Sequence, residues 1–191
     1  MRIHFIRHGE SEHNARFEAG LDPLALRFDA TLRDAGLTAL GRAQAEALTT
    51  DMRARPEIEL IVVSPLTRAI QTMLIGFANH AGARLVHDLH REHLQNFCDV
   101  GRSPALLAKE YPQLAFHHLD NPWWYTSLDG DAVYAPEPDD MFQARVTGFE
   151  SWLKARPEAE LAVVGHGTFL RHLTGEVFGN GERKEIDLKR D

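Results

Sequence analysis

Apolar residues recur along this chain with two different periods. Short, almost wholly apolar runs rich in isoleucine and valine occupy residues 3–6, 60–63, 85–87 and 161–164. Runs of this length and composition predict strands buried on both faces, as in a parallel sheet. Between them, apolar residues recur every three or four positions, which predicts helices. The alternation of strand and helix indicates an α/β fold, with a mainly parallel central sheet flanked by helices on both faces.

Several predicted helices carry a start signal or an apolar face. Thr38 can cap a helix, and apolar residues follow it at helical spacing, namely Leu40, Ala43, Ala47 and Leu48. Ser64-Pro65 places a capping hydroxyl, then a proline suited to the first helical position, directly after the second strand. Two later helices are predicted by apolar stripes, one beginning near Pro138 with Phe142, Val146, Phe149 and Leu153, the other with Phe169, Leu170, Leu173 and Val177.

Two segments lack a sustained period. The first covers residues 20–36, and the second covers residues 89–138. The second is rich in proline and contains the aromatic run Trp123, Trp124 and Tyr125. We expect it to be an insertion that forms a cap over the carboxyl edge of the sheet, where α/β folds bind ligands.

The length and composition are those of an ordinary globular protein. The chain has 191 residues, of which 43% are hydrophobic and 26% are charged. It contains no internal repeat and no linker-like stretch, so residues 1–191 are predicted to form a single domain. In the polar tail, Ile186 and Leu188 alternate with polar residues, which is compatible with a short edge strand.

Charge and cysteine content limit the partners and the compartment. The net charge of −7 disfavours nucleic acid and anionic membranes as partners, and we expect neither. A single cysteine, Cys98, rules out an intramolecular disulfide. The N-terminus does not look like a leader peptide, and no run approaches the roughly 20 apolar residues that span a bilayer. These features predict a cytoplasmic location.

The candidate chemistry begins with Arg7-His8-Gly9, directly after the first strand. A guanidinium can bind a phosphate through paired hydrogen bonds, and an imidazole can attack phosphorus. The adjacent glycine leaves room for a substrate. Taken alone, His8 would more often be a hydrogen-bonded loop residue than a nucleophile.

Two further residues belong at the same edge of the predicted sheet. His166, flanked by Gly165 and Gly167, follows the last core strand, and Arg68 lies one turn into the helix after the second strand. Parallel strands present their carboxyl ends at one edge, so the side chains should meet His8 there. Two imidazoles and two guanidiniums in one place suit a phosphoryl group, whose oxygens need several donors.

Two other kinds of chemistry can be compared with this one. The chain has 11 histidines, and a histidine-rich metal-binding module is suggested by the set His87, His90, His93, His117 and His118. Since His87 ends a strand, however, the first three would not share a helix. A cysteine-based phosphatase needs an arginine six positions after its cysteine, and Pro104 stands there.

The chain resembles the histidine phosphatase superfamily, the phosphoglycerate-mutase-like proteins, and within it the mutase-like branch 1. Three motifs carry the resemblance: Arg7-His8-Gly9, Ser64-Pro65-x-x-Arg68 and Gly165-His166-Gly167. It extends to smaller features, namely Glu10-Ser11, Asn14, Thr72 and Leu37-Thr38…Gly41…Gln44-Ala45. A looser match to such proteins of plants and fungi comprises His13-Asn14, Glu92, Cys98-Asp99-Val100-Gly101, Tyr111-Pro112 and Trp123-Trp124.

The resemblance implies a role for each site residue. His8 would be the nucleophile and would become a transient phosphohistidine. The phosphoryl oxygens would be bound by Arg7, Asn14, Arg68, His166 and the backbone N–H of Gly167. No metal and no cofactor are implied.

The general acid is implied by position. In the acid-phosphatase branch an aspartate follows the second histidine, but Gly167 stands there in this chain. The mutase-like branch takes a glutamate from the segment after the third strand, which corresponds to Glu92. Glu10 and Glu12 are alternatives by proximity in sequence, although capping or solvation of the first helix is the simpler role for them.

The resulting prediction is a metal-independent phosphoric monoester hydrolase that acts on a small phosphate ester. Phosphoglycerate-mutase-type phosphoryl transfer is the alternative, but a mutase must keep its phosphohistidine dry, and this chain has little spare length for a larger cover. Trp123, Trp124 and Tyr125 are candidates for an apolar or sugar-stacking wall, with core or cap packing as the competing role.

Overall fold

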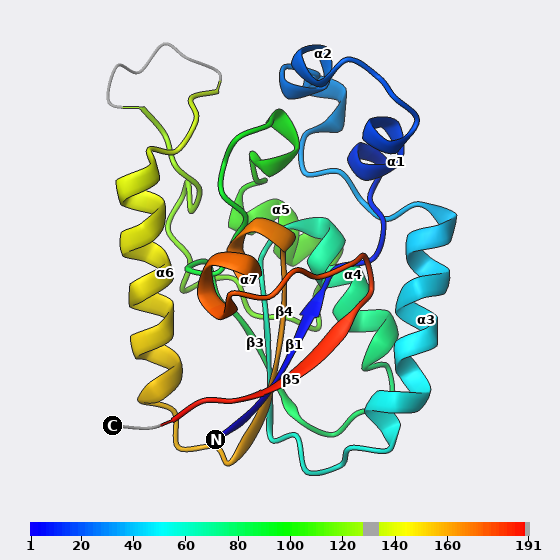
Figure 1. Cartoon of the computed structure of the whole chain (residues 1–191), viewed down its shortest axis with the longest axis vertical. Helices are drawn as coiled ribbons and strands as arrows, with labels where there is room; N and C mark the ends of the chain where they lie inside the picture. The colour runs from blue at the N-terminus through cyan, green and yellow to red at the C-terminus, as the bar shows by residue number, and fades with distance from the viewer. Residues whose placement is uncertain (128–133, 190–191) are drawn as a thin grey trace.

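The computed structural model describes residues 1–127 and 134–189 (Figure 1). The described residues contain one sheet with the strand order β3-β2-β4-β1-β5. Its strands are β1 (Arg2–Arg7), β2 (Leu60–Val63), β3 (Ala83–Val86), β4 (Glu160–Gly165) and β5 (Arg183–Asp187). All neighbours are parallel except β5, which runs antiparallel to β1 at the edge. The four predicted core strands are confirmed within two residues at each end, and the edge strand in the tail is present as β5, which contains Ile186 but ends before Leu188.

Strand register brings the two glycine-flanked histidines together. Ile6 of β1 and Val63 of β2 both stand opposite Val164 of β4. The residues after these positions therefore emerge at the same carboxyl edge. The backbone N–H of His8 donates to the Gly165 carbonyl oxygen (3.0 Å), which extends the β1–β4 ladder as far as the first histidine.

Helices cover both faces of the sheet, as the α/β prediction required (Figure 1). The longer helices are α3 (Ala39–Arg53), α4 (Thr67–Gly76) and α6 (Asp139–Lys154). The shorter helix α7 (Gly167–Thr174) follows β4. Shorter helical segments are α1 (Glu12–Glu18), α2 (Pro23–Arg27), η1 (Ala30–Leu32), η2 (Phe97–Asp99) and α5 (Pro104–Glu110). In the described part of the chain, no helix is both long and apolar enough to cross a membrane.

Alternation along the strands divides the core into two layers. Ile61 and Val63 of β2 face a cluster that includes Leu48 and Met52 of α3 and Ile70 of α4. The alternate β2 residues, Leu60 and Val62, face a second cluster with α6 and α7. The predicted α6 stripe is buried as expected, and it comprises Phe142, Val146, Phe149 and Leu153. Burial on both faces explains the continuous apolar runs in the sequence.

The buried face of α3 differs from the predicted one. Thr38 does cap the helix, and its hydroxyl accepts a hydrogen bond from the Gly41 backbone N–H (3.0 Å). Of the four predicted apolar positions, however, only Leu48 is buried. The helix instead buries Gly41, Ala45, Leu48 and Met52. The orientation follows from close backbone packing, since a Cβ atom at residue 41 would lie 2.0 Å from the Glu10 carbonyl oxygen.

Two other helix boundaries differ from the sequence prediction. Helix α4 begins at Thr67 rather than at Ser64-Pro65, because its first turn is capped from elsewhere in the chain. The Asp34 carboxylate accepts hydrogen bonds from the Thr67 backbone N–H (2.7 Å) and hydroxyl (2.6 Å). At the other end of the chain, Val177 lies beyond α7 and is 67% exposed, so it does not belong to the buried stripe.

Residues 89–138 were predicted to form a cap. The described part of this segment lies partly at the carboxyl edge of the sheet and partly on one of its faces. Its first part, through η2, reaches the carboxyl edge, whereas Leu107 of α5 packs into the core cluster on the α3 side. Trp123 is buried in the same cluster, and its indole N–H donates to the Arg102 carbonyl oxygen (2.9 Å). Residues 128–133 of this segment lie outside the described residues.

The contact between Gly41 and the strand-to-helix turn can be tested with matched glycine substitutions. Gly41→Ala places a methyl group against the Glu10 backbone, which cannot shift without disturbing the turn. We expect the substitution to lower the free energy of unfolding by about 2 kcal/mol. Gly148→Ala, within α6, meets no neighbour closer than 3.9 Å. The gain in helix propensity should make it neutral or stabilising, by up to about 1 kcal/mol. Urea unfolding of both variants measures the difference, and equal effects would contradict this packing.

Candidate active site

A cavity of about 550 Å³ opens at the carboxyl edge of the sheet. Of the residues predicted to carry the chemistry, its lining includes Arg7, His8, Asn14, Arg68, Glu92 and Gly167. His166 stands directly behind this lining, with its ring centroid 5.2 Å from that of His8. The structure therefore brings all the predicted site residues together, from β1, α1, α4, β4, α7 and the segment after β3.

His8 is held in one tautomer. Its Nδ1 lies 2.6 Å from the Gly9 carbonyl oxygen, which can only accept, so Nδ1 carries the proton and Nε2 is unprotonated. The Gly9 backbone N–H donates to the Thr72 hydroxyl (3.0 Å) and fixes the turn. Burial, followed by the charges of Arg68 and Arg7, lowers the pKa of His8 well below 6.5. The imidazole is therefore neutral near pH 7, as a nucleophile must be.

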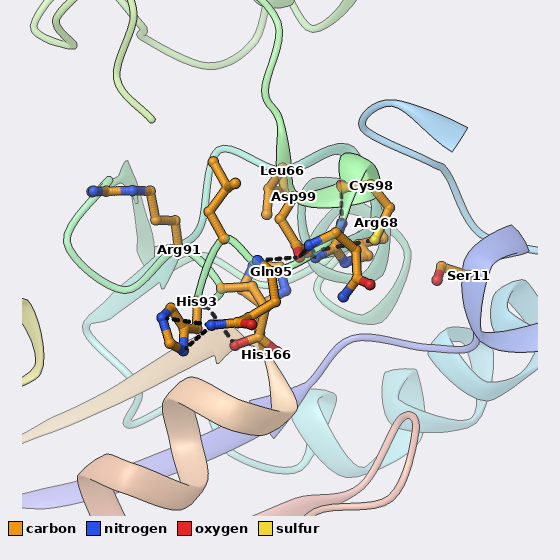
Figure 2. A network of polar contacts seen from close by, with 12 residues as sticks. Ser11, Leu66, Arg68, Arg91, His93, Gln95, Cys98, Asp99 and His166 are labelled. Carbon is orange, nitrogen blue, oxygen red and sulfur yellow. Dashed lines mark hydrogen bonds and ion pairs between the residues drawn. The ribbon is translucent and has the colours of Figure 1, made fainter. Parts of the chain in front are cut away.

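Arg68 is buried, and each nitrogen of its guanidinium has a partner. Nε donates to His8 Nε2 (3.2 Å), and one terminal nitrogen donates to the Cys98 carbonyl oxygen (2.9 Å). The other terminal nitrogen forms an ion pair with Asp99 (2.8 Å), with both side chains less than 5% exposed. Figure 2 shows Arg68 beside Cys98 and Asp99. The sequence pointed to Asp99 only as part of the looser resemblance and as an alternative proton donor to Glu92, and its pairing with Arg68 was not predicted.

His166 is held by a residue that the sequence analysis assigned to another role. Its Nε2 lies 2.7 Å from the Ser64 hydroxyl oxygen, so Ser64 orients an imidazole instead of capping α4. The other ring nitrogen, Nδ1, is buried and has no hydrogen-bond partner among the residues described. Burial and the charge of Arg68 lower the pKa of His166 well below 6.5. The Ser64 oxygen accepts from the Leu66 backbone N–H (3.4 Å), which is compatible with its hydroxyl donating to His166 Nε2. In that tautomer Nδ1 carries the proton, and a neutral ring with an unpaired N–H at this place suits an oxyanion ligand.

Arg7 passes closely beside Gly167. One terminal nitrogen of Arg7 donates to the Phe178 carbonyl oxygen (2.8 Å), while its Nε is buried and unpaired within the described part of the chain. A Cβ atom at residue 167 would lie 3.1 Å from that Nε. Glycine therefore allows the guanidinium to reach the cavity, a requirement separate from its own backbone N–H.

Asn14 is positioned by its helix cap. Its Oδ1 accepts from the Ser11 backbone N–H (3.2 Å) and hydroxyl (3.0 Å) and from Asn180 Nδ2 (3.1 Å). The amide oxygen is thus fully used, and Nδ2 is the atom that can donate to a phosphoryl oxygen. Asn180 also donates to the His8 carbonyl oxygen (3.3 Å). No motif pointed to Asn180, because it lies in an irregular tail far along the chain.

Glu92 lies at the N-terminus of α7. Its Oε1 accepts from the backbone N–H groups of His93 (2.9 Å) and Phe169 (3.0 Å), and its Oε2 accepts from that of Thr168 (3.1 Å). Burial, followed by the negative charge of Asp99, raises the pKa of Glu92 above its usual value. A half-buried carboxyl group with a raised pKa, on the cavity wall, has the properties of a general acid.

The alternative glutamates have structural positions. Glu10 accepts a hydrogen bond from the Thr38 hydroxyl (2.6 Å) at the start of α3, and it is not an ion-pair partner of Arg7 among the contacts described. Glu12 lies exposed in the first turn of α1, where a negative charge favours the helix. Neither carboxylate lines the cavity as described.

The histidines of the metal-binding alternative are used separately. His90 stacks on Phe149, and its Nε2 donates to the Val164 carbonyl oxygen (3.1 Å). His93 stacks on Phe142 with ring centroids 4.2 Å apart, while His87 packs edge-on against Trp152. In the described ranges, no three histidine, cysteine, aspartate or glutamate side chains are grouped as metal ligands would be.

Neither Cys98 nor the aromatic run supplies chemistry at this site. The Cys98 thiol is buried, and burial raises its pKa well above 9.0, which makes it a poor nucleophile. Trp123, Trp124 and Tyr125 lie outside the cavity. Trp124 packs beneath the Arg33 guanidinium (5.5 Å), and Tyr125 packs against the cluster of Leu94, Phe97 and Val100. Trp123 is therefore part of the core, and the half-buried Trp124 and Tyr125 pack against other side chains instead of lining the cavity.

Two neutral imidazoles and two guanidiniums around one cavity, at the carboxyl edge of a parallel sheet, are the arrangement of an α/β protein built to bind a phosphoryl group. Comparison with known families agrees. The chain belongs to the histidine phosphatase superfamily, branch 1, whose family model matches residues 3–189.

Individual relatives come from plants and fungi, as the looser sequence resemblance indicated. A "Phosphoglycerate mutase-like protein" of Arabidopsis thaliana is 28% identical over 206 residues, covering 90% of this chain and 72% of that protein. A protein of Schizosaccharomyces pombe named "Probable phosphatase" is 30% identical over 181 residues, covering 88% of this chain and 75% of that protein.

Solved structures share the fold. The alpha-ribazole phosphatase of Shigella flexneri has a TM-score of 0.66 and 20% identity, with 100% of this chain and 92% of that chain covered. A mycobacterial glucosyl-3-phosphoglycerate phosphatase, in complex with VO3, has a TM-score of 0.59 and 22% identity. Here the coverage is 97% of this chain and 90% of that one.

The buried neutral histidines predict how stability depends on pH. Burial lowers the pKa values of His8, His90 and His166 well below 6.5 in the folded protein. In the unfolded chain they titrate near 6.5, so the unfolded state binds more protons as the pH falls below that value. The free energy of unfolding should therefore decrease below about pH 6.5, by about 1.4 kcal/mol per pH unit for each of these histidines.

His90→Gln tests this dependence, because a glutamine amide can still donate to the Val164 carbonyl oxygen. The variant should lose about 1.4 kcal/mol per pH unit from the slope. His117→Gln, at an exposed site, should leave the slope as it is. Urea titrations of the three proteins at several pH values provide the measurement. An unchanged slope in His90→Gln would show that burial of this imidazole does not govern acid stability.

Proposed function

We propose that this protein is a phosphatase that hydrolyses a small phosphate monoester through a phosphohistidine at His8, without a metal ion. The observation that carries the proposal is the fixed tautomer of His8. Its Nδ1 proton is donated to the Gly9 carbonyl oxygen, and the unprotonated Nε2 accepts a hydrogen bond from the Arg68 guanidinium. A nucleophile and an anion-binding group are thus in contact at the floor of one cavity.

In the first step, the ester phosphate displaces the contact between Arg68 and His8 and is bound by both. The Nε2 lone pair of His8 forms a bond to phosphorus while the ester P–O bond breaks. The electron pair leaves with the ester oxygen, and Glu92 transfers its proton to that oxygen. Arg7, Arg68 and the unpaired His166 nitrogen stabilise the charge on the remaining phosphoryl oxygens.

In the second step, water replaces the leaving alcohol. The Glu92 carboxylate accepts a proton from the water as its oxygen attacks phosphorus. The bond between His8 Nε2 and phosphorus breaks, and its electron pair returns to the imidazole. Inorganic phosphate is released, and Glu92 is again protonated for the next cycle.

Exposure of the cavity rim favours hydrolysis over mutase chemistry. Phe17 and Val177 line the cavity, and their side chains are 55% and 67% exposed. Water can therefore reach the phosphohistidine, whereas a mutase must exclude it while an intermediate reorients. The free, buried thiol of Cys98 supports the reducing cytoplasm as the compartment in which the enzyme acts.

Covalent catalysis can be tested by trapping the intermediate. Acid-labile, base-stable label should appear on the protein when turnover of a ³²P-labelled ester is quenched, and His8→Ala should remove both label and turnover. His117→Ala, an exposed histidine far along the chain, serves as the matched control and should keep both. Incubation with 3-phosphoglycerate separates the two activities, since a phosphatase releases phosphate and a mutase forms the 2-isomer. Full activity of His8→Ala would show that His8 is not the nucleophile.

The role of Glu92 predicts a dependence on the leaving group. An alkoxide is strongly basic and needs a proton as the bond breaks, whereas nitrophenolate is stable as an anion. Glu92→Gln should therefore slow phosphorylation of His8 by an alkyl phosphate at least a hundredfold, and by nitrophenyl phosphate less than about tenfold. The comparison uses pre-steady-state formation of phosphohistidine, because loss of the base also slows water attack. Equal slowing with both esters would show that Glu92 has a binding role and does not protonate the leaving group.

A further inference from the structure

Asp99 is a buried carboxylate that the proposed reaction does not yet use. Its side chain is 3% exposed and belongs to the cavity wall. Oδ1 forms the ion pair with Arg68, while Oδ2 accepts from the backbone N–H groups of Asn96 (3.1 Å) and Gln95 (3.3 Å). Figure 2 shows the carboxylate between the guanidinium and the turn that begins η2. Three interactions therefore fix one negative charge at the edge of the phosphoryl site.

We propose that Asp99 is a positioning residue with two partners: it orients the Arg68 guanidinium beside His8, and it places a fixed negative charge next to Glu92. The inference rests on the proposed function, because it acts through the nucleophile and the general acid assigned there. Asp99 itself does not contact the reacting atoms.

The first partner explains why Arg68 is aimed at the nucleophile. A guanidinium has a rigid planar arrangement of donors, so fixing one side determines where the other side points. Asp99 and the Cys98 carbonyl oxygen occupy both terminal nitrogens, which leaves Nε directed at His8. Without the carboxylate, the buried cation would lose its ionic partner and would rotate or recruit water.

The second partner is affected through charge. When two carboxyl groups share one site, a negative charge on one of them makes ionisation of the other less favourable. Asp99 has the ion pair with Arg68, and Glu92 has only backbone donors. The negative charge of Asp99 accordingly raises the pKa of Glu92, which adds to the effect of burial.

The other charged and hydrogen-bonding groups around Glu92 oppose this effect, because they favour the ionised form of its carboxyl group. The Arg68 charge lowers the pKa of Glu92, and the backbone donors of His93 and Thr168 lower it as well. Arg7 from β1 faces the same carboxyl group and is attracted by its negative form. Removal of the Asp99 charge leaves burial as the named effect that still opposes these groups. Each of them favours the ionised form of Glu92, so the direction of the change is unambiguous.

The consequence is a shift in the pH dependence of the first chemical step. Protonated Glu92 is required for an alkyl leaving group, so phosphorylation of His8 should fall as the pH rises through the pKa of Glu92. Asp99→Asn removes the charge with almost no change in size. The falling limb should move to lower pH by about one unit. With nitrophenyl phosphate, which needs little protonation, no such limb should appear in either protein.

The experiment measures the rate of phosphohistidine formation by rapid quench at a series of pH values, with an alkyl phosphate and with nitrophenyl phosphate. Asp99→Glu keeps the charge on a longer side chain, and it should lower the rate without moving the limb. Asp34→Asn is the matched control for a buried carboxylate that holds α4, since Asp34 pairs with Arg102 and Thr67 instead of Arg68. It should reduce stability and leave the limb in place.

The outcomes separate this inference from the proposed function. If the wild-type protein forms no phosphohistidine, or if Glu92→Gln retains the limb, the proposed function fails and Asp99 loses its role with it. If the wild-type limb depends on Glu92 and Asp99→Asn leaves it unmoved, the inference alone is overturned. Asp99→Ser, also neutral and smaller, should give the same shift and replaces the asparagine variant if that one does not fold.

Discussion

Burial of the Arg68 guanidinium is the constraint from which the rest of the site follows. A charge removed from water must be paired and hydrogen-bonded, or its desolvation cost is not recovered. The pairing comes from Asp99 and the carbonyl group of Cys98, so η2 must fold over α4. The remaining donor of Arg68 then points at His8. One buried cation thereby connects a helix, a loop and the end of a strand.

The site is arranged to be incomplete without an oxyanion. His8 and His166 are neutral because burial and neighbouring cations lower their pKa values, so the positive charge beside them is carried by Arg7 and Arg68. Two of the buried donors at the cavity, Arg7 Nε and His166 Nδ1, have no partner among the residues described. Such donors are costly in isolation and favourable once charge develops on a phosphoryl group. The unpaired nitrogens are thus the same atoms that the proposed reaction uses.

The hydrophobic pattern predicted the strands well and the helix faces less well, for one physical reason. A strand buried on both sides is apolar at every position, so its position can be read without knowledge of its neighbours. A helix face depends on what packs against it. Close approach to the Glu10 backbone selects Gly41 for the buried face of α3, and hydrophobicity gives no sign of that. Similarly, Asp34 caps α4 across 33 residues, which displaced the predicted cap at Ser64.

The sequence by itself determined the α/β class, the order of the strands along the chain and the motif residues that meet at the carboxyl edge. These are local properties, because each motif residue directly follows a strand or begins a helix. Only the tertiary structure decided which groups support them. Asp99, Ser64 and Asn180 each bind a site residue that lies between 31 and 172 positions away. Contacts between such distant residues depend on how loops cross the sheet edge, and the local periodicity of apolar residues does not predict those crossings.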